Sequence, residues 1–265
     1  MKTVWMMLRI MVYSAFFAFT LAALVGCNFR GEQATEPEAG SAEGQSPKTE
    51  SKAPYVVQDL PGQSLTGKVL LEGKAPAPIK VPVNQDREVC GTEHENYPVR
   101  VEKGGIVDAV VWIDNIHKGK PFGLRQPVLD QKGCTYLPHI VLMQPGDLKV
   151  ESKDPVPHNV HTYADSNRNY NISMNQLIHT STMSFLRPER VDIRCDLHGW
   201  MNAYAVIAAN PYYTLTSAGG EFKIDQVPPG HYKVKAWQET LGEVEKDVIV
   251  EAAKPTAIDF TFQPK

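Results

Sequence analysis

Residues 191–201 read Val191-Asp-Ile-Arg-Cys195-Asp-Leu-His198-Gly-Trp-Met201, and their pattern indicates a strand followed by a tight loop. The first five residues alternate between apolar and charged, which predicts a half-buried strand with the Cys195 side chain pointing inward at the end. Upstream, Val156-Pro-His158-Asn-Val-His161 begins another strand. His158 shares a face with the Val two residues later, so we expect His158 to face the core and His161 to face away from it.

Other runs of the same kind extend this pattern along the chain. Apolar or alternating segments separated by Gly, Pro, Asp and Asn predict strands at residues 65–73, 106–113, 140–143, 148–151, 160–163, 191–195 and 204–208. Residues 171–185 fit either a short helix or an excursion loop. The chain has 20 Pro and 19 Gly, which favour short strands and turns. The sequence therefore predicts an all-β protein.

Length and charge limit the class of protein. At 265 residues the chain can form one large or two modest domains. Its 27 Lys and Arg against 30 Asp and Glu give a net charge of −3, which excludes a nucleic-acid binder that works through a basic surface.

The N-terminus is predicted to be a targeting segment. Lys2 and Arg9 precede an uncharged apolar run, and Leu24-Val-Gly-Cys27 resembles a bacterial lipobox in which the Cys carries a lipid. The alternative is an uncleaved anchor helix, or an ordinary signal peptide with a chance Cys. Residues 30–53 have almost no apolar side chains, which is typical of a flexible tether. We expect a signal peptide at 1–26 and a tether at 27–55, with the protein held by lipid on the extracytoplasmic side of a bacterial envelope membrane.

The C-terminal part predicts a second β-unit. Apolar residues alternate around 222–224 and 232–236, with further strands at 248–250 and 258–262. The stretch 219–237, with its Val-Pro-Pro-Gly turn, resembles the carboxypeptidase regulatory-like (transthyretin-like) sandwich module. That resemblance implies a structural or docking unit with a carbohydrate-binding-like fold at 209–265. An N-terminal β segment at 56–95 is expected, in which residues 64–83 complete this module or pack between the two units.

A metal site is predicted from four side chains. Cys195, His198 and Met201 lie on one tight loop, and His158 comes from the neighbouring strand. A thiolate, two imidazoles and a thioether suit copper that cycles between Cu(I) and Cu(II). The alternatives are an inert buried thiol beside a turn His and a core Met, a metal-free copy of the fold, or zinc, which more usually takes additional Cys or a carboxylate.

These two motifs together resemble the cupredoxins, the blue copper proteins of the amicyanin and plastocyanin type. The resemblance covers residues 96–208 and implies a Greek-key β-sandwich with one type 1 copper site at His158, Cys195, His198 and Met201. It also implies that Asn159 bonds to the Cys loop and that His198 with Trp200 forms the electron-transfer surface. Gly199-Trp200 stands where amicyanin has a Pro-aromatic pair, and the 163–190 connection is long.

The resemblance implies a one-electron carrier and not an enzyme, with redox partner proteins in the cell envelope. A copper-trafficking lipoprotein would use the same ligands. A non-redox docking or carbohydrate-binding-like lipoprotein would depend on the C-terminal module. An oxidase or nitrite reductase is disfavoured because the sequence has none of the clustered His-x-His pairs that multicopper enzymes use.

The remaining cysteines, Cys90 and Cys134, each stand beside a Gly in a turn-like context. In an exported protein this favours a disulfide, which would close a loop of about 45 residues. The alternative is a second metal site made by Cys134 with His139. His94, His117, His179 and His231 are expected at the surface.

Overall fold

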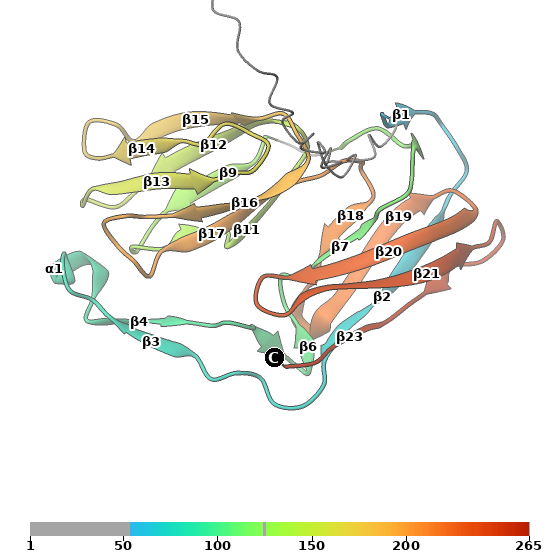
Figure 1. Ribbon diagram of the computed structural model, residues 1–265, viewed down its shortest axis with the longest axis horizontal. Helices are drawn as coiled ribbons and strands as arrows, with labels where there is room; N and C mark the ends of the chain where they lie inside the picture. Colours follow the sequence, from blue (N-terminus) through green and yellow to red (C-terminus); the bar gives the residue numbers. More distant parts are fainter. Residues whose placement is uncertain (1–53, 124–125, 265) are drawn as a thin grey trace, which may run out of the picture. The chain divides into compact units, whose positions relative to one another are not determined.

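The computed structural model describes residues 54–123 and 126–264, and almost all of its regular structure is β (Figure 1). The prediction of an all-β fold is confirmed. The expected signal peptide, the lipid attachment at Cys27 and most of the expected tether lie outside the described residues. Within these residues, no helix is long and apolar enough to cross a membrane.

The first sandwich, called the site sandwich here, consists of two sheets between residues 128 and 207. One sheet has the order β10 (Tyr136–Leu137), β9 (Val128–Gln131), β12 (Gly146–Ser152), β15 (Thr180–Phe185). The other has the order β11 (Ile140–Met143), β17 (Asn202–Ile207), β16 (Glu189–Arg194), β13 (His158–Tyr163), β14 (Asn171–Met174). The β9–β12 and β11–β17 pairs are parallel, and the others are antiparallel.

Apolar side chains from both sheets fill the space between them. Leu148 and Phe185 come from one sheet and Val160 and Val191 from the other, and all four are fully buried in one core cluster. Each comes from a strand in which buried and exposed residues alternate over at least part of its length, as a sheet with one face on a core requires. Cys195 and Met201 of the loop after β16 belong to the same core cluster.

The second sandwich combines distant parts of the chain. One sheet has the order β18 (Tyr213–Leu215), β7 (Val110–Ile113), β20 (Gly230–Gln238), β21 (Gly242–Val250). The other has the order β19 (Glu221–Val227), β2 (Gln63–Leu71), β6 (Gly105–Ile106), β5 (Val101–Glu102), with β22 (Thr256–Ala257) and β23 (Phe260–Phe262) pairing along β2. A short 3-10 turn, η1 (Ala218–Gly220), precedes β19, and β1 (Val56–Val57) pairs with β8 (Lys118–Gly119).

The sheets do not divide where the sequence predicted. Residues 101–113 were expected in the cupredoxin-like unit at 96–208, but β5, β6 and β7 belong to the second sandwich. Residues 64–83 were expected to complete the C-terminal module or to pack between the two units, and β2 does complete the second sandwich by pairing with β19, β22 and β23. Residues 79–82 pair elsewhere. Alternation shows that a strand is half-buried but does not show which sheet it joins.

Residues 79–96 form a separate hairpin, called the strap here. β3 (Ile79–Pro82) pairs antiparallel with β4 (Glu93–Asn96), and the short helix α1 (Arg87–Cys90) lies in the connection between them (Figure 1). Its buried members, Val83 and Cys90, belong to the core cluster of the site sandwich.

Two further expectations about chain segments are corrected. Residues 171–185 are neither a helix nor a loop, since β14 pairs with β13 and β15 pairs with β12. The expected tether ends before residue 55, because Tyr55 packs against the second core and its hydroxyl donates to the Lys120 carbonyl. Residues 171–185 are largely polar, and polarity alone does not show that β14 pairs with β13 and β15 with β12.

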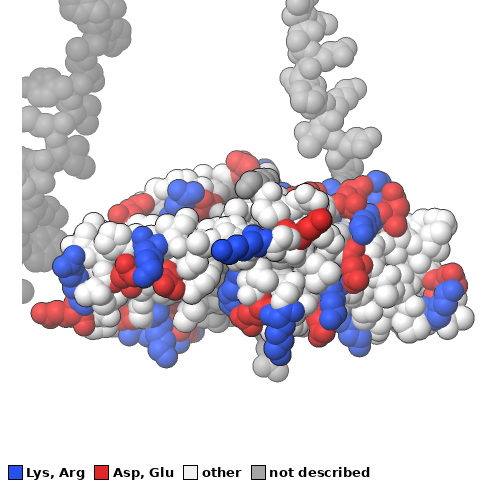
Figure 2. Space-filling model, turned by 90° about the horizontal axis from the view of Figure 1, so that it is seen from below, with Lys and Arg blue, Asp and Glu red and all other residues white. Residues whose placement is uncertain are grey.

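Acidic and basic side chains are interspersed on the surface in Figure 2. On the face shown, the described residues form no broad single-sign patch. This distribution agrees with the near-balanced composition of the chain.

Candidate metal centre

The loop between β16 and β17 presents three of the predicted ligands. Cys195 directly follows β16, its N–H donates to the Met201 carbonyl, and the Met201 N–H donates to the His198 carbonyl. These bonds close the seven-residue loop upon itself. Cys195, His198 and Met201 are 3%, 0% and 2% exposed, so all three side chains point into the protein.

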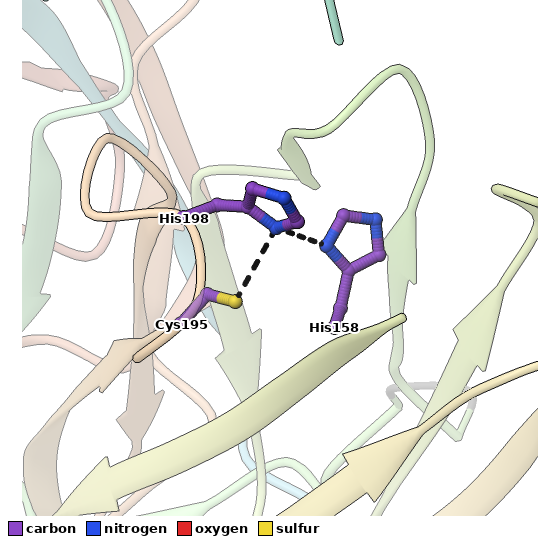
Figure 3. A group of neighbouring side chains, drawn as sticks. All are labelled: His158, Cys195 and His198. Carbon is purple, nitrogen blue, oxygen red and sulfur yellow. Dashed lines mark hydrogen bonds between the residues drawn. The ribbon is translucent and has the colours of Figure 1, made fainter. Parts of the chain in front are cut away.

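Three side chains converge at this end of the site sandwich (Figure 3). His158, the first residue of β13, places its Nδ1 2.9 Å from Nδ1 of His198. The Sγ of Cys195 lies 3.8 Å from the same His198 nitrogen. The three ligand atoms all lie within 4.8 Å of one another, and all three residues are buried. Cys195 is a free thiol.

Each of the two histidines has a carboxylate at its other nitrogen. Nε2 of His158 lies 2.9 Å from Oδ2 of Asp154, and Nε2 of His198 lies 3.0 Å from Oδ2 of Asp86. A carboxylate only accepts hydrogen bonds, so in the neutral form of either ring the hydrogen is on Nε2 and a bare lone pair is on Nδ1. Such a partner at the outer nitrogen is typical of histidines that bind metals.

The two Nδ1 lone pairs therefore face each other at 2.9 Å. Two acceptors at hydrogen-bond distance repel one another unless a cation lies between them. Metal–nitrogen bonds of about 2.0 Å allow one ion to reach both atoms. Burial lowers the pKa of His158 by more than its bond to Asp154 raises it, so the ring is neutral and able to ligate at pH 7. The donor set fits a metal ion.

The strand alternation in β13 separates the two histidines of the Pro-His-Asn-Val-His motif. His158 is fully buried beside Cys195 and His198. His161 has 29% of its side chain exposed, and its Nδ1 lies 3.0 Å from Oδ1 of Asp196. It stacks on Tyr163 with ring centroids 4.4 Å apart. His161 is thus outside the converging group.

Asn159 joins β13 to the Cys loop. Its Oδ1 accepts a 2.7 Å hydrogen bond from the Asp196 N–H, and its Nδ2 donates to Oδ2 of Asp196 at 2.8 Å. The expected bond from Asn159 to this loop is therefore present. It fixes the loop immediately after Cys195.

The expectation that His198 and Trp200 lie at the surface is wrong. His198 is 0% and Trp200 4% exposed, because the strap covers this side of the loop. The Trp200 ring stacks on His94 of the strap with centroids 5.0 Å apart, so His94 is not a free surface residue either. Leu197 is the exposed apolar side chain of the loop.

The predicted disulfide between Cys90 and Cys134 is present. It lies beside the histidines: Sγ of Cys90 is 4.0 Å from Nε2 of His198, and Sγ of Cys134 is within 4.8 Å of ligand atoms of Asp154 and His158. The alternative of a second metal site at Cys134 and His139 is wrong. Cys134 is in the disulfide, and Nε2 of His139 lies 3.0 Å from Oε1 of Glu239.

Sequence reasoning missed three residues that hold the centre. Asp154 accepts 2.7 Å bonds from the N–H groups of Gly133 and Cys134 besides contacting His158. The Tyr136 hydroxyl lies within hydrogen-bond distance of the carbonyls of Asn159 and Arg194 and shares its one hydrogen between them, so it bridges β13 and β16. The third is Asp86. The spacing of four residues to His158 is a signal for Asp154, whereas Asp86 is separated by 112 residues from His198 and gives none.

Comparison with known proteins gives partial similarities only. Polysaccharide lyase family 4, domain II, matches residues 194–258. No curated protein sequence matches the chain. Among solved structures, the copper-containing nitrite reductase from Thermus scotoductus SA-01 is similar over 34% of this chain and 24% of its own length, at 10% identity and a TM-score of 0.29.

Amicyanin structures are also similar to part of the chain. A Cu(I) amicyanin mutant matches 31% of this chain and 82% of its own length at 18% identity and a TM-score of 0.29. Amicyanin from Paracoccus versutus matches 32% and 84% at 16% identity and a TM-score of 0.28. The chain spans about a quarter of the nitrite reductase and most of amicyanin. Similarities at these TM-scores carry no conclusion about function, which has to be inferred from the side chains of the site.

Proposed function

We propose that this protein binds one copper ion through His158, Cys195 and His198, with Met201 as an axial ligand, and that it carries one electron. The observation that supports this most strongly is the pair of bare Nδ1 atoms 2.9 Å apart beside a buried free thiol. A thiolate with two imidazoles is the donor set of blue copper. Bound copper would supply a one-electron couple.

The residues around this set keep its geometry fixed. Asp154 and Asp86 hold the two imidazoles through Nε2, and Asn159 ties the Cys loop to β13. Tyr136 joins the two strands that present His158 and Cys195. Ligands locked in this way rearrange little when the charge at the centre changes, which favours fast electron transfer.

The burial of the ligands favours a carrier that retains its copper over a protein that hands copper to a partner. His158 and His198 are both fully buried, and the strap lies over His198. In a competition assay with a Cu(I) chelator, a carrier keeps its metal over the time of many electron exchanges. Rapid loss of copper would instead support trafficking.

The proposal places the protein on the extracytoplasmic side of a bacterial membrane, anchored through a lipid on Cys27, with redox proteins of the envelope as partners. It is not an enzyme on this proposal, since one copper with protein ligands at every position leaves no site for a substrate. Lipidation is tested by mass spectrometry of the N-terminal peptide from cells, with Cys27→Ala as the control.

The copper proposal is tested by adding Cu(II) to the purified protein and recording visible spectra. We expect one equivalent to produce an intense band from charge transfer between the Cys195 sulfur and copper, and Cys195→Ser to abolish it. Zinc has a filled d shell and would bind without colour. Failure to bind copper would contradict the proposal and favour a docking role for the second sandwich.

A further inference from the structure

The strap contacts the candidate metal centre although it lies far along the chain from His158 and the Cys loop. Its contacts converge on the Cys loop: Gln85 Nε2 donates to the Leu197 carbonyl, and Asn96 Nδ2 donates to the Trp200 carbonyl at 3.2 Å. The His94 ring stacks on Trp200. The strap therefore packs on the same loop that holds Cys195 and His198.

Asp86 is the strap residue that contacts a ligand. It precedes α1 in the left-handed conformation, with φ 53° and ψ 33°, and its Oδ2 lies 3.0 Å from Nε2 of His198. Its side chain is 33% exposed, whereas that of His198 is 0% exposed. The carboxylate thus occupies the side of the imidazole at which water would otherwise bind.

The disulfide fixes Asp86 in this place. Cys90 lies four residues after Asp86 in the same short helical turn, and the Cys90 N–H donates to the Asp86 carbonyl at 2.8 Å. Cys90 is bonded to Cys134, whose N–H and carbonyl contact Asp154 and Trp200 respectively. The disulfide therefore links the segment that carries Asp86, the partner of His198, to the loop that bonds to Asp154, the partner of His158.

We propose that Asp86 is a positioning residue of the metal centre, delivered to His198 by the disulfide-bonded strap. This inference rests on the proposed copper site. Asp86 fixes the hydrogen of His198 on Nε2 and aims Nδ1 at the metal. Its negative charge strengthens His198 as a donor, which favours Cu(II) over Cu(I). The centre is complete only when the strap is in place.

The test compares Asp86→Asn with Glu88→Gln in the full-length protein. Both changes remove one negative charge from the strap, and Glu88 is an exposed residue of α1. Asn tolerates the left-handed backbone conformation at residue 86, so the exchange keeps the local fold. We expect Asp86→Asn to lower the preference for Cu(II) over Cu(I) about tenfold, which raises the reduction potential by about 59 mV, and Glu88→Gln to leave it near the wild-type value.

A second measurement does not require metal. Nitrogen-15 NMR of the metal-free protein reports which ring nitrogen of His198 carries the hydrogen. We expect the Nε2–H form in the wild-type protein and in Glu88→Gln, and a mixture of both forms in Asp86→Asn. Equal free energies of unfolding for the two variants would show that the difference is not a general loss of structure.

The role of the strap is tested by a double-mutant cycle. Replacing Cys90 and Cys134 by Ser releases the strap, and we expect the reduction potential to rise as it does in Asp86→Asn. Adding Asp86→Asn to this variant should then have little further effect. Additive effects would overturn the claim that the disulfide delivers Asp86.

The outcomes separate this inference from the proposed function. If the wild-type protein takes up copper with colour but Asp86→Asn and Glu88→Gln share its potential and its His198 NMR signals, only the role of Asp86 is overturned. If the wild-type protein takes up no copper, the proposed function fails, and the inference fails with it.

Discussion

The Nδ1 atoms of His158 and His198 lie 2.9 Å apart although 40 residues separate them in the chain. Asp154 and Asp86 lie at the opposite nitrogens, so in the neutral rings the hydrogens are on Nε2 and the two Nδ1 lone pairs face each other. A cation bound to both lone pairs would remove the repulsion between them. The Cys195 thiol lies 3.8 Å from Nδ1 of His198 and could bind the same cation. The proposed copper site depends on this pair of nitrogen atoms.

Removing one histidine of the Pro-His-Asn-Val-His motif should distinguish the two faces of β13. We expect His158→Ala to abolish the visible copper band, because it removes a buried ligand. His161→Ala should keep the band, since His161 bonds to Asp196 on the outer face. Spectra recorded during Cu(II) titration make the comparison. If His161→Ala bleaches the protein while His158→Ala does not, the assignment of the faces is wrong.

Met201→Leu should raise the reduction potential and leave the protein coloured. A thioether donates weakly to the metal and stabilises Cu(II) more than Cu(I), so its loss favours the reduced state. We expect a rise on the order of 59 mV, a tenfold change in preference. Met143→Leu is the matched control, because Met143 is fully buried in the same core but lies on β11. Equal potentials in the two variants would exclude Met201 as a ligand.

Loss of the disulfide should lower the stability of the folded protein. Cys90 and Cys134 are 44 residues apart, and closing a loop of that length stabilises by about 4 kcal/mol in the chain-entropy description. Urea unfolding of the metal-free protein should show this loss when both residues are replaced by Ser. A reductant should produce the same loss in the wild-type protein and none in the double variant. An unchanged midpoint in the double variant would contradict the prediction.

Stability should fall with rising pH through the ionisation of His139. Burial lowers the pKa of His139, but the hydrogen bond and the charge of Glu239 and the Asn202 carbonyl outweigh it, so the net pKa is raised. The folded state therefore holds the proton more tightly than the unfolded state does. This contribution is complete below about pH 6.5, the ordinary value for His, and disappears as the pH rises through the raised pKa.

The variant His139→Gln should remove this pH dependence while keeping a donor for Glu239. The free energy of unfolding of both proteins is measured with urea at several pH values above and below about 6.5. We expect the advantage of the wild-type protein over the variant to shrink as the pH rises. Parallel curves for the two proteins would show that this pair does not titrate with folding.

The local pattern of the chain predicted the parts of the centre that are close in sequence. Alternation in residues 191–195 places Cys195 inward, and the period of two separates His158 from His161. The seven residues from Cys195 to Met201 form one loop in the structure, as their spacing predicts. The turn-like contexts of Cys90 and Cys134 predicted the disulfide.

Which strands form each sandwich was harder to predict from the sequence. β2 and β7 read correctly as strands, but their partners β19 and β20 lie more than a hundred residues away along the chain. Pairing between such distant strands depends on the packing of the complete core, which no local window of sequence contains. For this reason the predicted boundary at residue 96 does not match the sheets.

The local sequence pattern predicted that the protein is all-β and that Cys195 and His158 face inward, because a period of two is a local property of a strand. That the strap covers the Cys loop becomes apparent only in the folded chain. Asp86 contacts His198 across 112 residues, and the strap that carries it buries a histidine expected at the surface. Contacts of this kind depend on where two distant segments meet, and a disulfide and a packed core, not a local pattern, fix that meeting point.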